Sequence, residues 1–289
     1  MFKSTVVATL VFSLAFVYQA MAQQPSAAEP KEVFGWTKTL VGSLNLTQNS
    51  FSSNWTKGGE NSVAWKGVVE TKWENNQTKT NWRNTAKLAF GQIKQGSDDF
   101  RKSDDEIKVE SVLTYKVGKF LNPYGSFSGN TQIATGYNYT DSAGVTIKTA
   151  VSSFFDPAYL RQSLGLGYKP AESLTTRLGF SVKETFADEH RVRYGNDPDE
   201  SVRVETGIES TTDLALKIDE NVLLTSKLEM FTGFEALNTV DVNWDNALAA
   251  KVGKYFAVNL NVVLFYDEDV LSELQVKQVL AFGLTYTFF

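Results

Sequence analysis

Long segments of this chain alternate apolar and polar residues with a period of two. From Val202 to Ile218, mostly apolar side chains alternate with charged or polar ones such as Arg203, Glu205 and Glu209. Successive side chains of a β-strand point to opposite faces, so this period predicts strands with one apolar and one charged face. The segment is longer than the about five or six residues usual in globular sheets. Long strands of this kind are typical of transmembrane β-barrels, which face lipid outside and a polar lumen inside.

The same alternation predicts twelve strands after Trp36, and longer connections alternate with short turns along them. Single-chain bacterial barrels have an even number of strands, with long loops at one end and short turns at the other. We therefore expect an all-β fold, a single transmembrane antiparallel up-and-down β-barrel of about 12 strands. The expected strands are 37–48, 61–75, 78–93, 105–118, 121–137, 158–169, 172–185, 200–218, 221–234, 239–252, 255–267 and 272–289.

Aromatic residues recur at spacings that suit the two girdles of such a barrel. Trp65 and Trp73 share one face and lie eight residues apart, as do Trp82 and Phe90 on the next predicted strand. A tilted strand climbs about 2.5 Å per residue along a barrel axis, so each pair spans roughly the lipid-facing band. These residues are predicted to face lipid at the two membrane interfaces.

The N-terminus has the features of a cleaved signal peptide. Lys3 precedes an apolar stretch from Val6 to Val17, and Ala20-Met21-Ala22 fits the small-residue cleavage rule. We expect residues 1–22 to be a signal peptide cleaved after Ala22, residues 23–35 a periplasmic linker, and residues 36–289 the barrel. This organisation predicts the bacterial outer membrane as the location, with lipid and lipopolysaccharide as surroundings.

The final strand ends in Gly283-Leu284-Thr285-Tyr286-Thr287-Phe288-Phe289. This resembles the C-terminal signal by which the barrel assembly machinery recognises outer-membrane proteins, with Gly283, Tyr286 and Phe288 in the matching positions. It departs from the usual pattern at Ala281, where a polar residue is common, and in the extra Phe289. The resemblance implies that this machinery is a partner during biogenesis.

Composition excludes several kinds of chemistry. The chain has no cysteine, one histidine and a formal net charge of −5. Disulfides and thiolate metal sites are therefore excluded, and nucleic acid is not expected as a partner. Asp188 and His190 are close enough in sequence for a surface-hydrolase dyad, a hypothesis that we rank last because a loop histidine is usually only solvated. We expect no catalytic residues, no metal and no cofactor.

Two loop motifs and a later segment resemble a known family. They are Asn54-Trp55-Thr56-Lys57-Gly58-Gly59-Glu60-Asn61-Ser62, then 95–105 (QGSDDFRKSDD), and 156–170. These resemble the NW-x-x-GGENS and QGxDDFRKxDD elements of an outer-membrane β-barrel family of unknown function found in Bacteroidota and relatives. The resemblance implies a barrel and implies no activity. It singles out Trp55, Gly58, Gly59, Asp98 and Asp99 as loop-motif residues.

The predicted lumen carries charges of both signs. Two interpretations remain open, since barrels of this size range from filled to water-containing. In the first, a polar pore passes small solutes by porin-like passive or facilitated transport. In the second, ion pairs plug the lumen, and a structural barrel binds envelope partners through acidic extracellular loops. The candidate lumen residues are Lys66, Glu70, Arg83, Lys87, Arg161, Arg177, Arg203, Glu205, Glu209, Asp213, Lys227, Glu229, Asp241 and Asp245.

Overall fold

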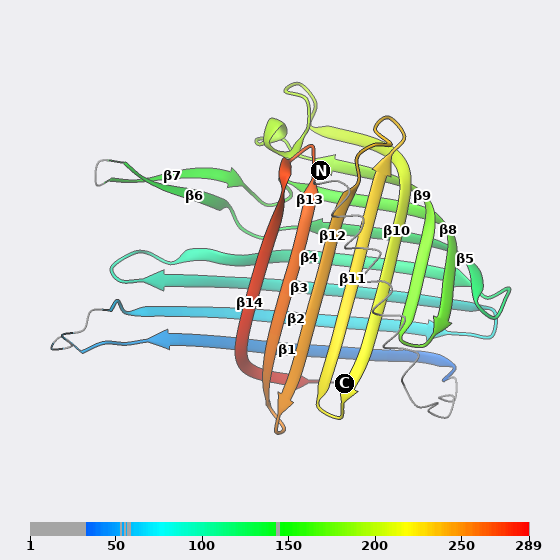
Figure 1. Ribbon diagram of the computed structural model, residues 1–289, viewed down its shortest axis with the longest axis horizontal. Coiled ribbons are helices and arrows are strands. Elements are labelled where there is room, and N and C mark those ends of the chain that lie inside the picture. Colours follow the sequence, from blue (N-terminus) through cyan, green and yellow to red (C-terminus); the bar gives the residue numbers. More distant parts are fainter. Residues whose placement is uncertain (1–32, 53, 55, 57–58, 143–144, 289) are drawn as a thin grey trace. The chain divides into compact units, whose positions relative to one another are not determined.

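The computed structural model describes residues 33–52, 54, 56, 59–142 and 145–288. Twelve strands close into a barrel in which every neighbouring pair is antiparallel (Figure 1). The predicted fold class and strand number are confirmed. The barrel strands are β1 (Gly35–Asn49), β2 (Ser62–Asn76), β3 (Thr80–Gln95), β4 (Arg101–Tyr115), β5 (Leu121–Thr131), β8 (Ala158–Ala171), β9 (Leu174–Phe186), β10 (Val202–Asp219), β11 (Val222–Gly233), β12 (Asp241–Val252), β13 (Phe256–Asp267) and β14 (Leu271–Thr287).

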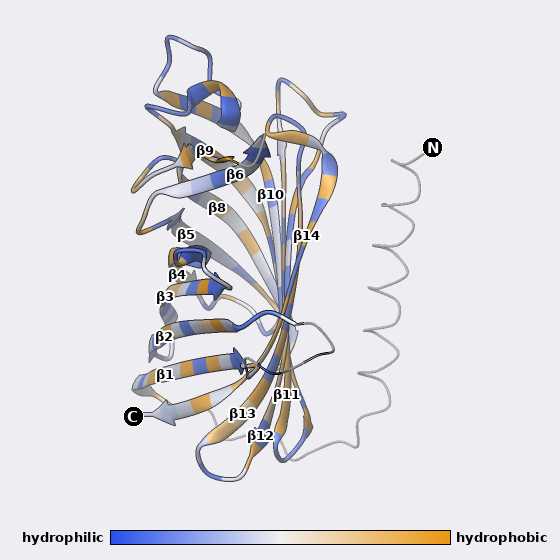
Figure 2. Ribbon diagram, turned by 90° about the vertical axis from the view of Figure 1, so that its left-hand side faces the viewer, coloured by the Kyte–Doolittle hydropathy of each residue, from blue (hydrophilic) through white to orange (hydrophobic). Residues whose placement is uncertain are grey.

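The alternating apolar and polar residues lie on the outer and inner faces of the barrel, respectively. Leu164, Phe180 and Leu280 point outward with exposed fractions of 71, 70 and 69 %, whereas Arg177 and Lys183 are 3 % exposed. Figure 2 shows hydrophobic and hydrophilic residues following one another along β1, β2 and β3. An apolar exterior with charges inside reverses the arrangement of a soluble protein and suits a bilayer.

Outward-facing aromatic rings from different parts of the barrel wall contact one another at two levels. Near the short turns, Trp36 lies 6.0 Å from Trp82 and Phe120 lies 6.4 Å from Tyr168, measured between ring centroids. Towards the long loops, the Trp65 and Phe90 rings lie 5.8 Å apart. Two levels of rings are the arrangement of aromatic girdles at the edges of a lipid-facing band.

The described residues contain no helix long and apolar enough to span a bilayer. The one short helical element among them is the 3₁₀ turn η1 (Arg191–Tyr194), in the connection between β9 and β10.

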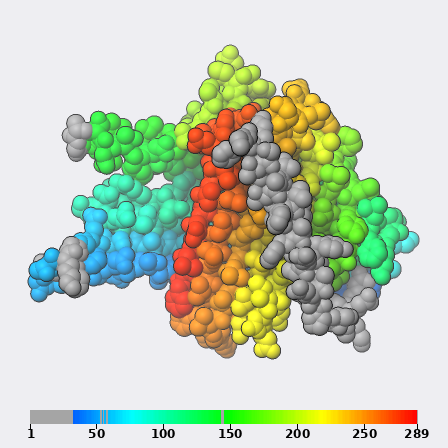
Figure 3. Space-filling model, viewed as in Figure 1, coloured from blue at the N-terminus to red at the C-terminus, as the bar shows by residue number. Residues whose placement is uncertain are grey.

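The connection predicted as a plain loop over 138–157 contains a further hairpin. Strand β6 (Gly136–Ser142) pairs with β7 (Val145–Ser152) in a sheet of their own, and the barrel continues directly from β5 to β8. In Figure 3 the hairpin projects from the barrel as a separate arm. The loop prediction was wrong because the segment contains a run of β-branched residues, Val145-Thr146-Ile147, and such residues favour a pleated strand.

Strand β4 also begins earlier than expected, at Arg101 instead of residue 105. The register between β3 and β4 shifts at Gly91/Gln92, so a β-bulge accommodates the change in alternation that had marked 101–104 as loop.

Candidate functional site

Charged side chains from opposite walls of the barrel meet across the lumen. The Arg177 guanidinium of β9 lies 2.7 Å from the Glu110 carboxylate of β4 and 3.3 Å from that of Asp213. Asp213 also lies 3.3 Å from Arg83 of β3, and Lys227 of β11 lies 3.0 Å from Glu110. We call these five residues the constriction cluster. Because β3 and β4 are not neighbours of β9, β10 or β11, the pairs made by Glu110 and by Arg83 can only cross the interior.

Burial makes the constriction cluster interdependent. The Arg177 side chain is 4 % exposed and that of Glu110 is 11 % exposed, so both charges depend on their ion-pair partners, which are Glu110 and Asp213 for Arg177 and Arg177 and Lys227 for Glu110. Arg177 also lies over the Tyr124 ring at 5.7 Å, while the Tyr124 hydroxyl and Ser163 Oγ are hydrogen-bonded at 2.9 Å. The cluster therefore forms a connected polar network across the lumen, in which Glu110, Arg177, Asp213 and Lys227 each have more than one oppositely charged partner.

A cavity of about 440 Å³ lies inside the barrel on the long-loop side of the cluster. We call it the vestibule. Its walls carry charges of both signs, and Lys183 joins three acids across them, at 2.7 Å from Asp241, 3.3 Å from Asp267 and 3.4 Å from Glu205. The charged residues lining it are Lys66, Lys87, Asp104, Asp105, Glu106, Lys108, Arg161, Lys183, Glu229, Asp241, Asp245, Asp267 and Lys277.

The predicted lumen residues lie on the inner face, and ten of them belong to the constriction cluster or line the vestibule. Glu70 of β2 faces Lys87 of β3 in register. On β10, Glu209 lies 3.4 Å from Arg161, and Arg203 lies 2.7 Å from both Glu205 and Asp269. Arg83, Arg177, Asp213 and Lys227 belong to the constriction cluster, and Lys66, Lys87, Arg161, Glu229, Asp241 and Asp245 line the vestibule.

Sequence reasoning left several charges of the vestibule unassigned, among them Asp104 and Lys277. Asp104 is ion-paired with both Lys66 of β2 and Lys277 of β14. Asp104 had been assigned to a loop because the bulge hides its parity, and Lys277 was not singled out on the last strand. A search for period two that allowed one bulge would have placed Asp104 inside.

The loop-motif residues lie apart from the lumen charges. Asp98 forms an ion pair of 2.7 Å with Arg101, the first residue of β4. Asp99 is exposed. Gly59 adopts a φ of 140° against the Phe51 ring, a backbone conformation that needs glycine. Trp55 and Gly58 lie outside the described residues, as does Ala22.

The residues of the proposed assembly signal lie at the closing seam. Gly283 of β14 pairs with Asn45 of β1, and an added Cβ there would lie 2.5 Å from the Leu44 carbonyl oxygen. Tyr286 and Phe288 point outward with ring centroids 4.9 Å apart. Their position leaves the aromatic rings accessible from the lipid side.

His190 lies beside Asp156 and not beside Asp188. Its Nδ1 is 3.1 Å from Asp156 Oδ2, whereas Asp188 pairs with Arg191 at 2.5 Å. The dyad considered from the sequence is therefore not formed in the structure. Asp156 and His190 are 34 residues apart in the chain, so spacing could not have revealed their contact.

Solved structures similar to this chain are bacterial barrels, at low similarity. The translocator domain of the autotransporter NalP from Neisseria meningitidis is 10 % identical with a TM-score of 0.38, over 98 % of this chain and 97 % of that one. The COG4313 outer membrane channel from Pseudomonas putida F1 is 10 % identical with a TM-score of 0.39, over 90 % of this chain and 99 % of that one. At these scores the strand paths differ too much for either protein to guide inference about this one.

A comparison with curated proteins found no match. A family model does match part of the chain. The matched part covers strands β2 to β5 and the loops between them. It includes both loop motifs, 54–62 and 95–105, that resemble a known family. Residues 46–137 of this twelve-stranded barrel match the family described as "Protein of unknown function (DUF3078)".

Proposed function

We propose that this chain is an outer-membrane barrel that passes small polar solutes through its charged lumen, with the constriction cluster controlling passage. The vestibule carries the proposal, since this cavity of about 440 Å³ has charges of both signs in its wall, and its residue Glu229 pairs with Lys227 of the constriction cluster. Groups of both signs in its wall offer partners to small solutes of either charge. We expect facilitated passage, in which a solute or salt ion transiently takes the place of one member of an ion pair in the lumen.

The plugged barrel is the second candidate, and the constriction cluster itself favours it. Arg177 is held by two acids and a ring, and its side chain is 4 % exposed. Removing one member of a buried ion pair is strongly unfavourable, so the cluster would resist opening. In that case the barrel is structural, and its acidic loops bind envelope partners.

Single-channel conductance in planar bilayers tests the proposal. We would compare the unmodified barrel with the double variant Arg177→Ala/Glu110→Ala. The double variant removes the strongest cross-lumen pair and leaves Arg83 with Asp213 and Lys227 with Glu229, which lie 3.3 Å apart in both cases. A matched control is Lys72→Ala/Glu74→Ala, which removes an ion pair between two residues of the same strand, β2.

We expect discrete conductance steps in the unmodified barrel. The steps of the double variant should be at least about twofold larger, because the Arg177 and Glu110 side chains no longer occupy the lumen. The control should conduct like the unmodified barrel. A complete absence of steps in both the unmodified barrel and the double variant, across salt and voltage, would contradict passage and support the plugged barrel.

The location and partners follow from the same architecture. An apolar exterior with two levels of aromatic rings supports insertion into the outer membrane, among lipid and lipopolysaccharide. The exposed rings of Tyr286 and Phe288 support recognition by the barrel assembly machinery. Truncating the chain before Gly283 should abolish membrane insertion in cells, as measured by fractionation.

A further inference from the structure

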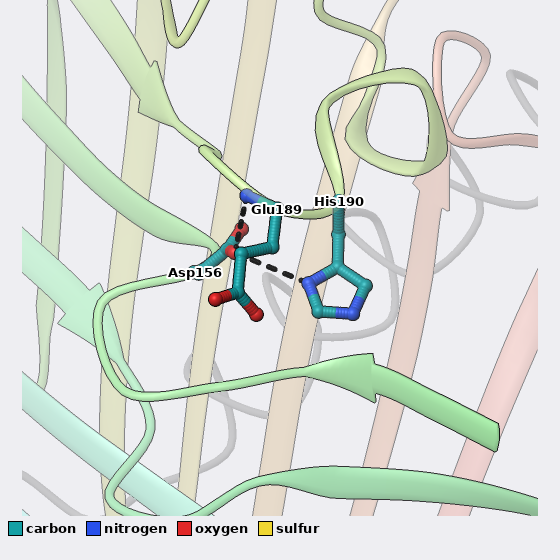
Figure 4. Close-up of side chains that lie close together, drawn as sticks. All are labelled: Asp156, Glu189 and His190. Carbon is teal, nitrogen blue, oxygen red and sulfur yellow. Dashed lines mark hydrogen bonds and ion pairs between the residues drawn. The ribbon is translucent and has the colours of Figure 1, made fainter.

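The connection between β9 and β10 packs on the turn that precedes β8, and three side chains with metal-binding atoms meet there. Asp156 belongs to the turn, which is closed by backbone hydrogen bonds to Ser153 of 2.7 and 3.1 Å. Glu189 and His190 come from the connection, just before η1. Figure 4 shows the three residues side by side, with the Glu189 backbone N–H and the His190 ring both bonded to the Asp156 carboxylate.

The spacing of the donor atoms suits a small divalent ion. Asp156 Oδ2 and His190 Nδ1 lie 3.1 Å apart. Two ligand atoms that each lie about 2.0–2.1 Å from a tetrahedral zinc ion are separated by about 3.3 Å. One donor atom from each of the three residues lies within 4.8 Å of the others. The Glu189 side chain is exposed, so a rotation about its own bonds would bring its carboxylate to the same point.

The charge of Asp156 is incompletely compensated without a cation. The residue is 5 % exposed, and its Oδ1 is buried without a hydrogen-bond partner. Within the described part of the chain its one ion-pair partner is His190. Arg191, which follows His190 in the chain, is bonded to Asp188 and to the Pro198 carbonyl oxygen. A buried, underbonded carboxylate is costly unless a positive charge lies against it.

We propose that Asp156, Glu189 and His190 form a binding site for one divalent transition-metal ion, with zinc the best match. One imidazole nitrogen and two carboxylate oxygens are a ligand set that zinc accepts, with water in the fourth position. Calcium and magnesium prefer oxygen ligands alone and more of them. The ion would tie the β9–β10 connection to the turn before β8. This site is separate from the lumen, and it departs from the absence of metal expected from the sequence.

A metal-free clamp is the competing explanation, because the hydrogen bonds from His190 and the Glu189 backbone already join the two segments. The Glu189 side chain separates the explanations. It makes none of those bonds, so Glu189→Gln should leave a clamp unchanged and weaken a metal site. The neighbouring acid Asp188 serves as a control, since it is exposed and outside the group.

The test is calorimetric titration of zinc chloride into the full mature barrel, refolded in detergent, stripped with a chelator and free of any histidine tag. Glu189→Gln, His190→Asn and Asp188→Asn are titrated in parallel, with circular dichroism to verify folding. We expect one zinc ion per unmodified barrel and an unchanged affinity in Asp188→Asn. Glu189→Gln should bind at least about tenfold more weakly, and His190→Asn should lose binding, because each removes a direct ligand.

Two results would overturn the proposal. One is an unmodified barrel that takes up no zinc at millimolar concentrations. The other is a Glu189→Gln affinity equal to that of Asp188→Asn, which would leave only general attraction to loop acids. Magnesium chloride, titrated alone, should bind at least about tenfold more weakly than zinc, and equal binding of the two ions would also contradict the assigned ligand set.

Discussion

Inward-facing glycines make room for the aromatic side chains of the lumen. At Gly207 of β10, an added Cβ would lie 2.9 Å from the Phe231 ring and 2.1 Å from the Thr232 carbonyl oxygen. At Gly179 it would lie 2.8 Å from the Tyr124 hydroxyl. Phe231 in turn lies against Arg161 and Lys183 at 5.6 and 5.5 Å. Glycine at these positions thus determines where rings and cations lie inside.

Replacing Gly207 by alanine should destabilise the barrel by about 1–3 kcal/mol, the usual cost of overpacking a filled interior. Gly67 is the matched control, because no atom lies within 4 Å of a Cβ added there. Alanine at Gly67 should change the free energy of unfolding by less than about 1 kcal/mol. Urea unfolding in detergent, followed by tryptophan fluorescence, measures both. Equal stability of the two variants would show that the space above Gly207 is not filled.

The constriction cluster yields a second prediction for a single residue. Glu110→Ala removes the common partner of Arg177 and Lys227 but leaves Asp213 beside Arg177 and Glu229 beside Lys227. We therefore expect a loss of about 1–3 kcal/mol, the usual cost of removing one partner of a buried polar group. Glu172→Ala removes an exposed pair with Lys169 and should cost less than about 1 kcal/mol. The same unfolding measurement compares them, and similar losses in both would show that the lumen charges are well hydrated.

Among the elements, the hairpin β6–β7 is the one that contributes least to closing the barrel. Its strands pair only with each other, and its outer residues such as Val145 and Ile147 are 65 and 50 % exposed. The end nearest the barrel is different, since Gln132 donates to the carbonyl oxygens of Ser153 and Asp156. These hydrogen bonds hold the barrel end of the hairpin in place.

The hydroxyl of Tyr194 contacts the same hairpin. It donates to the Val151 carbonyl oxygen, and burial raises the pKa of Tyr194.

Shortening this arm should leave the barrel intact. Replacing residues 138–149 by Asn-Gly retains the Tyr137–Ala150 pair and closes it with a two-residue turn. We expect an unchanged circular dichroism spectrum and a melting temperature within about 4 °C of the original, because few contacts of the barrel are removed. Failure of the shortened chain to refold would mean that the arm is needed for assembly.

For the molecule as a whole, closure depends on one short seam. Strands β1 and β14 are paired over five residues, Val41–Asn45 against Gly283–Thr287, while β1 and β2 are paired over fifteen. A closed barrel has no free edge, which is why strands can span a bilayer at all. The pairing of the last barrel strand with the first therefore removes both edges of the sheet.

Engineered cysteines can test the seam cleanly, because the chain has none of its own. Leu44 and Leu284 are register partners, so Leu44→Cys/Leu284→Cys should form a disulfide on oxidation in the folded barrel. Leu44→Cys/Leu280→Cys is the control, because Leu280 is four residues along β14 and pairs with Leu260 of β13. Mass spectrometry after thiol alkylation measures both. Efficient crosslinking in the control alone would require a different register.

The sequence was sufficient for properties that depend on one strand at a time. Lipid outside and a polar lumen inside impose a period of two on every strand, so the fold class, the number of barrel strands and the side on which Arg177 or Leu164 lies follow from local pattern. The start of β4 did not follow, because one bulged residue reverses the parity without any change in composition. Neither did the hairpin β6–β7, because short β-branched runs also occur in loops.

Contacts between distant strands depend on register and on the curvature of the closed sheet, which no local pattern encodes. Arg177 and Glu110 are 67 residues apart, and only closure brings their walls together into a constriction. His190 meets Asp156 for a similar reason, since packing of the β9–β10 connection on the turn before β8 selects Asp156 over its sequence neighbour Asp188. Local chemistry decided which residues face inward, and the path of the whole chain decided which of them touch.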